Sequence, residues 1–198
     1  MKGNGIVFLD KDGTLIEDLP YNVEPRRIRL APRAREAVRL WSDHGWPIAI
    51  VTNQSGVARG YFTLEALDAV AEHLETIVRR LGADWRGFYA CPHLPDGINE
   101  YGIPCECRKP APGLIRRAAA ELGVDAHDSW FIGDTWMDMA AGRAAGCRTV
   151  LVGPEWRRAS TYPAEAQPDH AVPDLLSAAR VVVGVGDRRE GIALEEPR

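Results

Sequence analysis

The chain has 198 residues, a formal net charge of −4 and 45% hydrophobic residues. This length favours one well-filled domain over two, and the composition is that of a globular protein, which excludes the disordered and fibrous classes. The acidic balance gives no electrostatic reason to bind a polyanion such as DNA. We therefore expect a single domain over residues 1–185, followed by a loose, charged tail over 186–198.

The N-terminal region carries no predicted targeting or membrane-spanning segment. Residues 5–9 form a short apolar run that ends at Asp10, which is typical of a strand and not of a signal peptide. No run approaches the roughly 18 apolar residues needed to cross a bilayer. The sequence therefore predicts a cytoplasmic protein with no membrane partner.

Short apolar runs alternate with helix-like stretches, which predicts a parallel sheet flanked by helices. The predicted strands cover residues 6–9, 47–51, 86–90, 130–132 and 148–152. The predicted helices cover residues 31–45, 63–81, 112–122, 136–145 and 173–183. The expected fold class is thus α/β, with a doubly wound, Rossmann-like, mostly parallel sheet and no room for a large cap domain.

Local signals indicate where the helices begin and end. Pro32 suits the first turn of the first helix, and Gly123 and Gly146 suit the C-terminal caps of the third and fourth. In the second helix, apolar residues recur at helical spacing and should face the sheet. They are Leu64, Leu67, Val70, Leu74, Ile77 and Leu81.

Polar side chains with matched chemistry follow the predicted strands. Ligands of open α/β sheets bind at the carboxyl ends of the strands, where this chain places Asp10, Asp12, Thr52, Lys109 and Asp134. A carboxylate cluster repels itself unless a cation neutralises it, and hard oxygen ligands suit Mg²⁺ that also holds a substrate phosphate. Asp10 can then attack phosphorus, and Asp12 can exchange a proton with the leaving oxygen. Thr52 and Lys109 can donate to the phosphoryl oxygens.

Two further segments extend this site. Residues 53–56, Asn-Gln-Ser-Gly, add amide, hydroxyl and backbone donors, and Gly56 permits close approach of the backbone to a phosphate. Asp138 lies within the predicted fourth helix, where it can act as a partner of the helix dipole, so we leave it out of the metal set.

Two Cys-x-Cys/His pairs, separated by residues 94–104, predict a structural zinc site. Four soft ligands close a tetrahedral Cys₃His site and leave no position for water. The alternative is a set of unrelated buried cysteines. The resulting zinc loop over 91–107 would lie over the mouth of the phosphate site and position Arg108 and Lys109. The predicted zinc ligands are Cys91, His93, Cys105 and Cys107.

The chain resembles the haloacid dehalogenase superfamily of aspartyl phosphatases over about residues 6–153. The matching motifs, in order, are Asp10-x-Asp12-Gly13-Thr14, Thr52, Lys109 and Gly133-Asp134-x-x-x-Asp138. The resemblance implies that Asp10 is the nucleophile and Asp12 the general acid and base. It implies that Thr52 and Lys109 stabilise the phosphate. The implied magnesium ligands are Asp10, Asp134 and the main-chain carbonyl of Asp12.

Within that superfamily, the Thr-Asn-Gln-Ser-Gly segment over 52–56, the Cys/His segment and Arg108-Lys109-Pro110 are similar to the D-glycero-D-manno-heptose 1,7-bisphosphate 7-phosphatases. This resemblance implies an enzyme of surface-glycan biosynthesis that removes the C7 phosphate of a small phosphorylated sugar. The chain departs from the pattern at Thr135, where related enzymes often have lysine, and matches it loosely over 18–21. The implied substrate-binding residues are Asp18, Tyr21, Thr52, Asn53, Gln54, Ser55, Gly56, Arg108, Lys109 and Thr135.

Three alternatives remain at this level. A histidinol-phosphate phosphatase looks similar, but it usually has a shorter insert between its zinc-ligand pairs. A polynucleotide 3′-phosphatase shares the Thr-Asn-Gln-x-Gly theme, against which the acidic balance and the zinc loop argue. A catalytically inactive, zinc-stabilised binding module would be expected to have lost a motif residue, and none is lost. The sequence leaves the anomer at C1 and the oligomeric state open, although we favour a monomer.

Overall fold

The computed structural model describes residues 4–184, which build one six-stranded sheet with strand order β3-β2-β1-β4-β5-β6. Every strand pair in it is parallel. The predicted tail over 186–198 lies outside the described residues. The strands are β1 (Val7–Leu9), β2 (Ile48–Asn53), β3 (Trp85–Cys91), β4 (Trp130–Gly133), β5 (Arg148–Leu151) and β6 (His170–Ala171).

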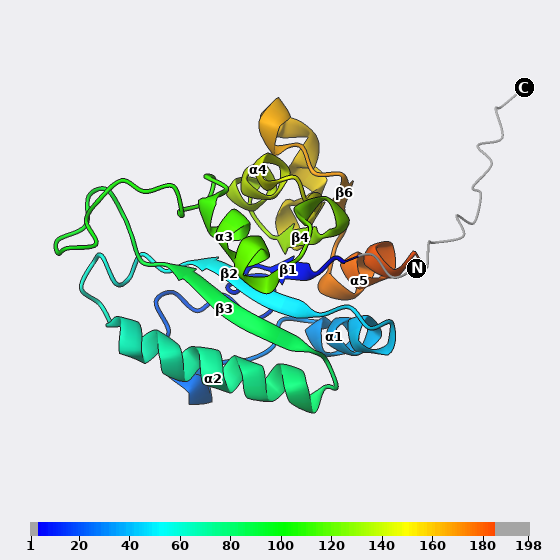
Figure 1. Ribbon diagram of the computed structural model, residues 1–198, viewed down its shortest axis with the longest axis horizontal. Coiled ribbons are helices and arrows are strands. Elements are labelled where there is room, and N and C mark those ends of the chain that lie inside the picture. Colours follow the sequence, from blue (N-terminus) through cyan, green and yellow to red (C-terminus); the bar gives the residue numbers. More distant parts are fainter. Residues whose placement is uncertain (1–3, 185–198) are drawn as a thin grey trace, which may run out of the picture.

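Helices cover both faces of the sheet, which confirms the predicted doubly wound class (Figure 1). One face carries α1 (Ala34–Asp43), α2 (Leu64–Arg80) and α5 (Leu175–Val183). The other carries α3 (Gly113–Leu122) and α4 (Trp136–Ala145). Short 3₁₀ helices lie in the connections: η1 (Pro25–Arg27), η2 (Ala126–Asp128), η3 (Pro154–Thr161) and η4 (Ala164–Ala166).

The connections between these elements leave the carboxyl edge of the sheet without a large cap. Within residues 4–184, the two longest connections are the loop after β1 and the loop after β3. The first contains only the three-residue helix η1, and the second contains no helix or strand.

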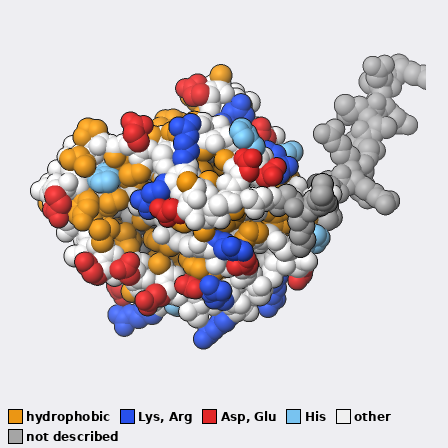
Figure 2. Space-filling view, in the orientation of Figure 1, with side chains coloured by type: hydrophobic (Ala, Val, Ile, Leu, Met, Phe, Trp, Pro, Cys, Tyr) orange, Lys and Arg blue, Asp and Glu red, His pale blue; other side chains and the backbone are white. Residues whose placement is uncertain are grey.

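Among the described residues, none of the helices has the length and apolar character needed to cross a membrane. Basic and acidic side chains are interspersed over the face of the molecule shown in Figure 2, as is typical of a solvent-exposed surface.

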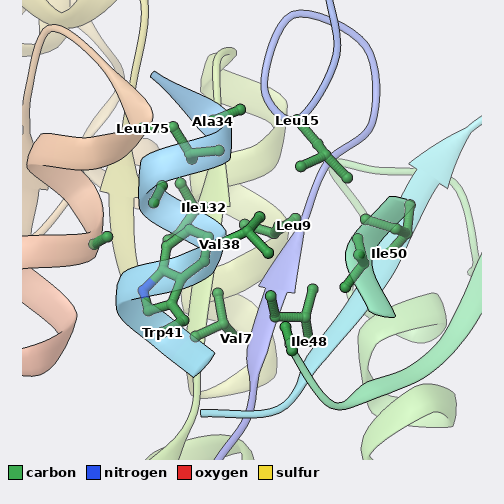
Figure 3. Packing of buried hydrophobic residues seen from close by; sticks show 14 of the residues in the cluster. Val7, Leu9, Leu15, Ala34, Val38, Trp41, Ile48, Ile50, Ile132 and Leu175 are labelled. Atoms are coloured by element: carbon green, nitrogen blue, oxygen red, sulfur yellow. The ribbon is translucent and has the colours of Figure 1, made fainter. Parts of the chain in front are cut away.

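The core forms because alternate residues of each strand point to opposite faces of the sheet. Val7 and Leu9 pack toward α1, whereas Phe8 between them joins the cluster on the α3 side. In Figure 3, Val38 and Trp41 of α1 meet the side chains of the central strands. Both residues are fully buried, so α1 is fixed against the strand that leads to Asp10.

The predicted elements are found at nearly the expected boundaries, with two differences. The first helix begins at Ala34 and not near Pro32, because Arg33 has a φ of 66° and so takes the left-handed conformation that cannot continue a helix backward. The short strand β6 was not predicted. The caps at Gly123 and Gly146 are confirmed, since both glycines have positive φ.

The predicted apolar stripe of α2 is wrong at its first member. Leu64 is 38% exposed because it lies in the first turn of α2, whereas the contacts of this helix with the main core cluster begin at Val70. Leu74 is fully buried in that cluster. The two leucines therefore occupy opposite environments on one helix.

This contrast gives a stability prediction. We expect Leu74→Ala to lower the free energy of unfolding by about 2–5 kcal/mol, because it removes buried methyl groups and leaves a cavity. The control Leu64→Ala should change it by no more than about 0.5 kcal/mol, as exposed substitutions usually do. Urea unfolding followed by circular dichroism measures both. Equal losses for the two variants would contradict the assigned packing of α2.

Candidate active site

The site lies where the order of the strands reverses direction along the sheet. β1 pairs with β2 on one side and with β4 on the other, which makes it a topological switch point. A cavity of about 190 Å³ opens at the carboxyl ends of these three strands. It is lined by Asp10, Asp12, Asp18, Thr52, Asn53, Lys109, Asp134, Thr135, Met137 and Asp138.

Lys109 occupies the floor of this cavity and is 3% exposed. Its Nζ donates to Asp10 Oδ1 at 2.6 Å, to Asp138 Oδ1 at 2.5 Å and to the Val51 carbonyl at 3.1 Å. Burial by itself would lower the pKa of Lys109, but the charges of Asp10 and Asp138 outweigh burial and raise that pKa above its ordinary value. The lysine therefore stays charged and holds one oxygen of each carboxylate.

Asp138 is thus part of the site through an ion pair, which the sequence interpretation did not foresee. Its second oxygen, Oδ2, accepts from the Thr135 hydroxyl at 2.5 Å and from the Thr135 backbone N–H at 3.0 Å. Thr135 and Asp138 form a capping box at the start of α4, and the Thr-x-x-Asp spacing is the sequence signal for it. Both oxygens of Asp138 are therefore engaged by protein groups.

Asp134 forms no salt bridge with a cationic side chain of the described residues. Burial, with Asp10 and Asp138 nearby, raises the pKa of Asp134 to about 7. Burial also raises the pKa of Asp10 to about 6, although Lys109 opposes the shift. Carboxylate oxygens of Asp10, Asp134 and Asp138 lie within 4.8 Å of one another. This cluster of buried and half-buried carboxylate oxygens fits a hard cation such as Mg²⁺.

Gly13 allows Asp134 to approach the loop after β1. Its φ is 76°, a conformation that L side chains rarely adopt, and a Cβ there would lie 2.3 Å from Asp134 Oδ2. The Thr14 hydroxyl donates to Asp134 Oδ1 at 3.3 Å. The Asp-x-Asp-Gly-Thr motif therefore both supplies carboxylates and leaves room for the carboxylate that arrives from β4.

Asp12 is held by two side chains that come from different loops. Lys11 Nζ donates to its Oδ1 at 2.7 Å, and Gln54 Nε2 donates to its Oδ2 at 3.1 Å. The same Gln54 nitrogen also donates to Thr52 Oγ1 at 3.0 Å. Lys11 was not predicted as a site residue, and it is only 1% exposed. Its position between two site aspartates was the only available signal.

Asn53 and Lys109 are joined through the backbone of the lysine. Asn53 Nδ2 donates to the Lys109 carbonyl at 3.1 Å, and the Lys109 backbone N–H donates to Asn53 Oδ1 at 3.0 Å. Asn53, predicted as a phosphate donor, thus fixes the loop that carries Lys109. Both the oxygen and the nitrogen of its side-chain amide take part in that pairing.

A second hollow of about 240 Å³ adjoins the first and also contains Asp12. Every predicted substrate-binding residue except Arg108 lines one of these two hollows. Arg108 instead donates through Nη1 to the His93 carbonyl at 3.3 Å. The second hollow is lined by Lys11, Asp12, Asp18, Pro20, Tyr21, Asn22, Asn53, Gln54, Ser55 and Gly56.

Gly56 has a structural role besides the predicted close approach to a phosphate. A Cβ at this position would lie 2.2 Å from a ring carbon of Phe62, so the aromatic ring occupies the space that a side chain would need. The turn after β2 therefore folds tightly over residues 55–61.

The Cys/His segment forms a compact cluster that could hold zinc. The three sulfur atoms are 3.1–3.6 Å apart, and His93 Nδ1 lies 3.2 Å from Cys107 Sγ and 3.8 Å from Cys91 Sγ. Ligands about 2.0–2.3 Å from a tetrahedral ion would be separated by roughly 3.3–3.8 Å. The four protein ligands fill such a site, which fits a structural ion.

The loop between the two ligand pairs does not cover the mouth of the site, and that expectation is wrong. No residue of 92–104 lines either hollow. The loop packs on the turn after β2 instead, where the Ile98 backbone N–H donates to the Ala58 carbonyl at 2.8 Å and Asn99 Nδ2 donates to the Val57 carbonyl at 2.7 Å. One backbone N–H and one side-chain amide of the loop thus satisfy two carbonyl groups of that turn.

Comparisons with known proteins match this architecture. A HAD-hydrolase-like family model matches residues 106–178. The chain is 40% identical over 147 residues to the D-glycero-beta-D-manno-heptose-1,7-bisphosphate 7-phosphatase of Pasteurella multocida. The matched region covers 74% of this chain and 80% of that protein. It is also 40% identical to the enzyme of the same name from Yersinia pestis, over 74% of this chain and 78% of that protein.

Solved structures of phosphatases have a similar fold. A putative HAD-like phosphatase from Mesorhizobium loti has a TM-score of 0.78 at 30% identity and covers 96% of this chain and 91% of that one. The D,D-heptose 1,7-bisphosphate phosphatase of B. bronchiseptica, complexed with magnesium and phosphate, has a TM-score of 0.76 at 28% identity, with coverage of 91% and 99%. The chain therefore belongs to the haloacid dehalogenase superfamily, in the family of the D-glycero-β-D-manno-heptose-1,7-bisphosphate 7-phosphatases.

Proposed function

We propose that this protein is a magnesium-dependent phosphatase that removes the C7 phosphate of D-glycero-β-D-manno-heptose 1,7-bisphosphate. The observation that carries the proposal is the buried Asp10 at the end of β1, with one oxygen held by Lys109 in a cavity that also contains Asp12 and Thr52. The names of the relatives support the sugar and its anomer.

Asp10 is the nucleophile in this proposal. Lys109 engages its Oδ1, so Oδ2 remains to attack phosphorus and form an aspartyl-phosphate. The bond between phosphorus and the sugar oxygen breaks, and that oxygen takes a proton from Asp12. Water then attacks the aspartyl-phosphate, with Asp12 accepting its proton, and phosphate leaves. Lys109 and Thr52 stabilise the charge on the transferring group.

Two metals complete the proposal. Asp10 and Asp134, with the main-chain carbonyl of Asp12, would hold Mg²⁺, which supplies positive charge beside the transferring phosphoryl group. The three cysteines and His93 would hold Zn²⁺ in a purely structural role. Asp10, which is buried, and Asp134, which is half-buried, both have raised pKa values and support the first assignment.

A substrate panel tests the proposed reaction. Phosphate release should be fastest, measured as kcat/KM, with the β anomer of the heptose bisphosphate, slower with the α anomer and slowest with histidinol phosphate. Asp10→Asn should abolish turnover of all three because an amide cannot attack phosphorus. A preference for histidinol phosphate would overturn the proposed substrate, and steady turnover by Asp10→Asn would overturn the proposed nucleophile.

Magnesium binding has a readout that is independent of activity. We expect added Mg²⁺ to raise the melting temperature of the wild type by a few degrees, since a ligand that binds only the folded state stabilises it. Asp134→Asn should remove that shift. The control Asp18→Asn, an exposed carboxylate at the rim, should keep it. An undiminished shift in Asp134→Asn would place the ion elsewhere.

Zinc should co-purify at about one ion per chain and resist dialysis. Cys107→Ser removes one soft ligand beside the loop that carries Lys109, so we expect lost zinc, a lower melting temperature and an activity loss that added Mg²⁺ does not restore. Cys147→Ala is the matched control because Cys147 is a buried cysteine outside the cluster. Metal analysis and kcat/KM check both. A zinc-free Cys107→Ser protein with full activity would contradict the role of the loop.

A further inference from the structure

The side of the site that receives the sugar follows from Asp12, if the proposed function holds. The residue that protonates the leaving oxygen must lie next to it. Asp12 lines two hollows beside the phosphate cavity, one of about 240 Å³ and a smaller one of about 130 Å³, and the larger offers more room for a sugar. A hollow of about 480 Å³ beside Trp136 and Tyr162 is not lined by Asp12. The sugar therefore extends into the hollow that Tyr21 lines.

Tyr21 has a backbone conformation that its residue type disfavours. The Asn22 backbone N–H donates to the Leu19 carbonyl at 3.1 Å and closes a four-residue turn with Pro20 in second place. Tyr21, in third place, has a φ of 55°. Glycine or asparagine is usual at a third turn position with positive φ, and a bulky residue there is strained. Tyr21 is also 49% exposed, so burial in the core does not compensate for the strain.

Tyr61 holds the Tyr21 ring from a different loop. The two ring centroids are 4.7 Å apart and the ring planes meet at 82°, which is the edge-to-face arrangement that aromatic pairs favour. The Tyr61 backbone N–H donates to the Gly56 carbonyl at 2.9 Å, so the tyrosine is tied to the tight turn after β2. Tyr61 is 61% exposed and does not line the hollow itself.

We propose that Tyr61 is a positioning residue for the sugar. It fixes the Tyr21 ring as the apolar wall against which the C–H groups of the sugar chain pack, while polar residues that line the same hollow meet the sugar hydroxyls. The strained turn presents the Tyr21 side chain at this wall, and the edge-to-face contact limits its rotation. Tyr61 acts through Tyr21 and has no contact with the reacting atoms.

The test compares a large and a small leaving group. Tyr61→Ala should raise KM for the heptose bisphosphate by up to roughly tenfold, the upper end of one aromatic pair interaction, with kcat within about twofold of wild type. Tyr61→Phe keeps the ring and should restore the wild-type KM. Neither variant should change kcat/KM for acetyl phosphate, whose small leaving group does not reach Tyr21.

A double-mutant cycle separates positioning from direct contact. Tyr21→Asn fits the positive φ, so we expect an undiminished melting temperature together with a raised KM. Adding Tyr61→Ala to Tyr21→Asn should raise KM no further. Additive effects, an unchanged KM in Tyr61→Ala, or an equal loss with acetyl phosphate would each overturn the inference.

The same experiment distinguishes a wrong substrate from a wrong role for Tyr61. If the wild type hydrolyses acetyl phosphate but not the heptose bisphosphate, the proposed substrate is wrong. Mannose 6-phosphate then replaces it as the sugar probe in the same cycle. A KM for that probe that does not respond to Tyr61→Ala would overturn the positioning role as well.

Discussion

The rest of the site depends on the buried contact of Lys109 with Asp10 and Asp138. The ammonium group uses its three donors on these two carboxylates and the Val51 carbonyl, and so joins the end of β1, the start of α4 and the end of β2. Removing one partner of an ion pair as deeply buried as this one costs about 3–5 kcal/mol of stability, because the other charge is left buried without a partner. The contact with Lys109 engages Asp10 Oδ1 and leaves Oδ2 as the oxygen that can react.

The placement of Lys109 in turn depends on a loop that has little apolar packing of its own. Lys109 follows the Cys/His cluster, and its backbone N–H and carbonyl both hydrogen-bond to the side-chain amide of Asn53. The cluster fixes one side of this segment and Asn53 fixes the other. A loop anchored by the Cys/His cluster and by Asn53 can therefore place a lysine in a buried position without contributing a strand or a helix there.

The sequence predicted the parts of the fold that repeat a simple pattern. Buried parallel strands are continuous apolar runs, so five strands were found, whereas β6 has two residues, His170 and Ala171, and no apolar run. The aspartates, Thr52 and Lys109 were predicted to converge because they follow strands, and they line one cavity. The roles of Asp138 and Lys11 could not be predicted, because only the tertiary fold brings Lys109 to α4 and turns Lys11 back toward Asp12.

An active site without a large cap must take its specificity from loops, and here each loop is in contact with the next. The loop over 92–104 hydrogen-bonds to the turn after β2 at Val57 and Ala58. That turn carries Tyr61, which holds Tyr21 at the edge of the second hollow. The segment that contains the Cys/His cluster is thus linked to both hollows, through Lys109 to the first and through a chain of contacts that ends at Tyr21 to the second. The loop supports the turn that carries Tyr61 and lines neither hollow, so it can define the shape of the second hollow without filling it.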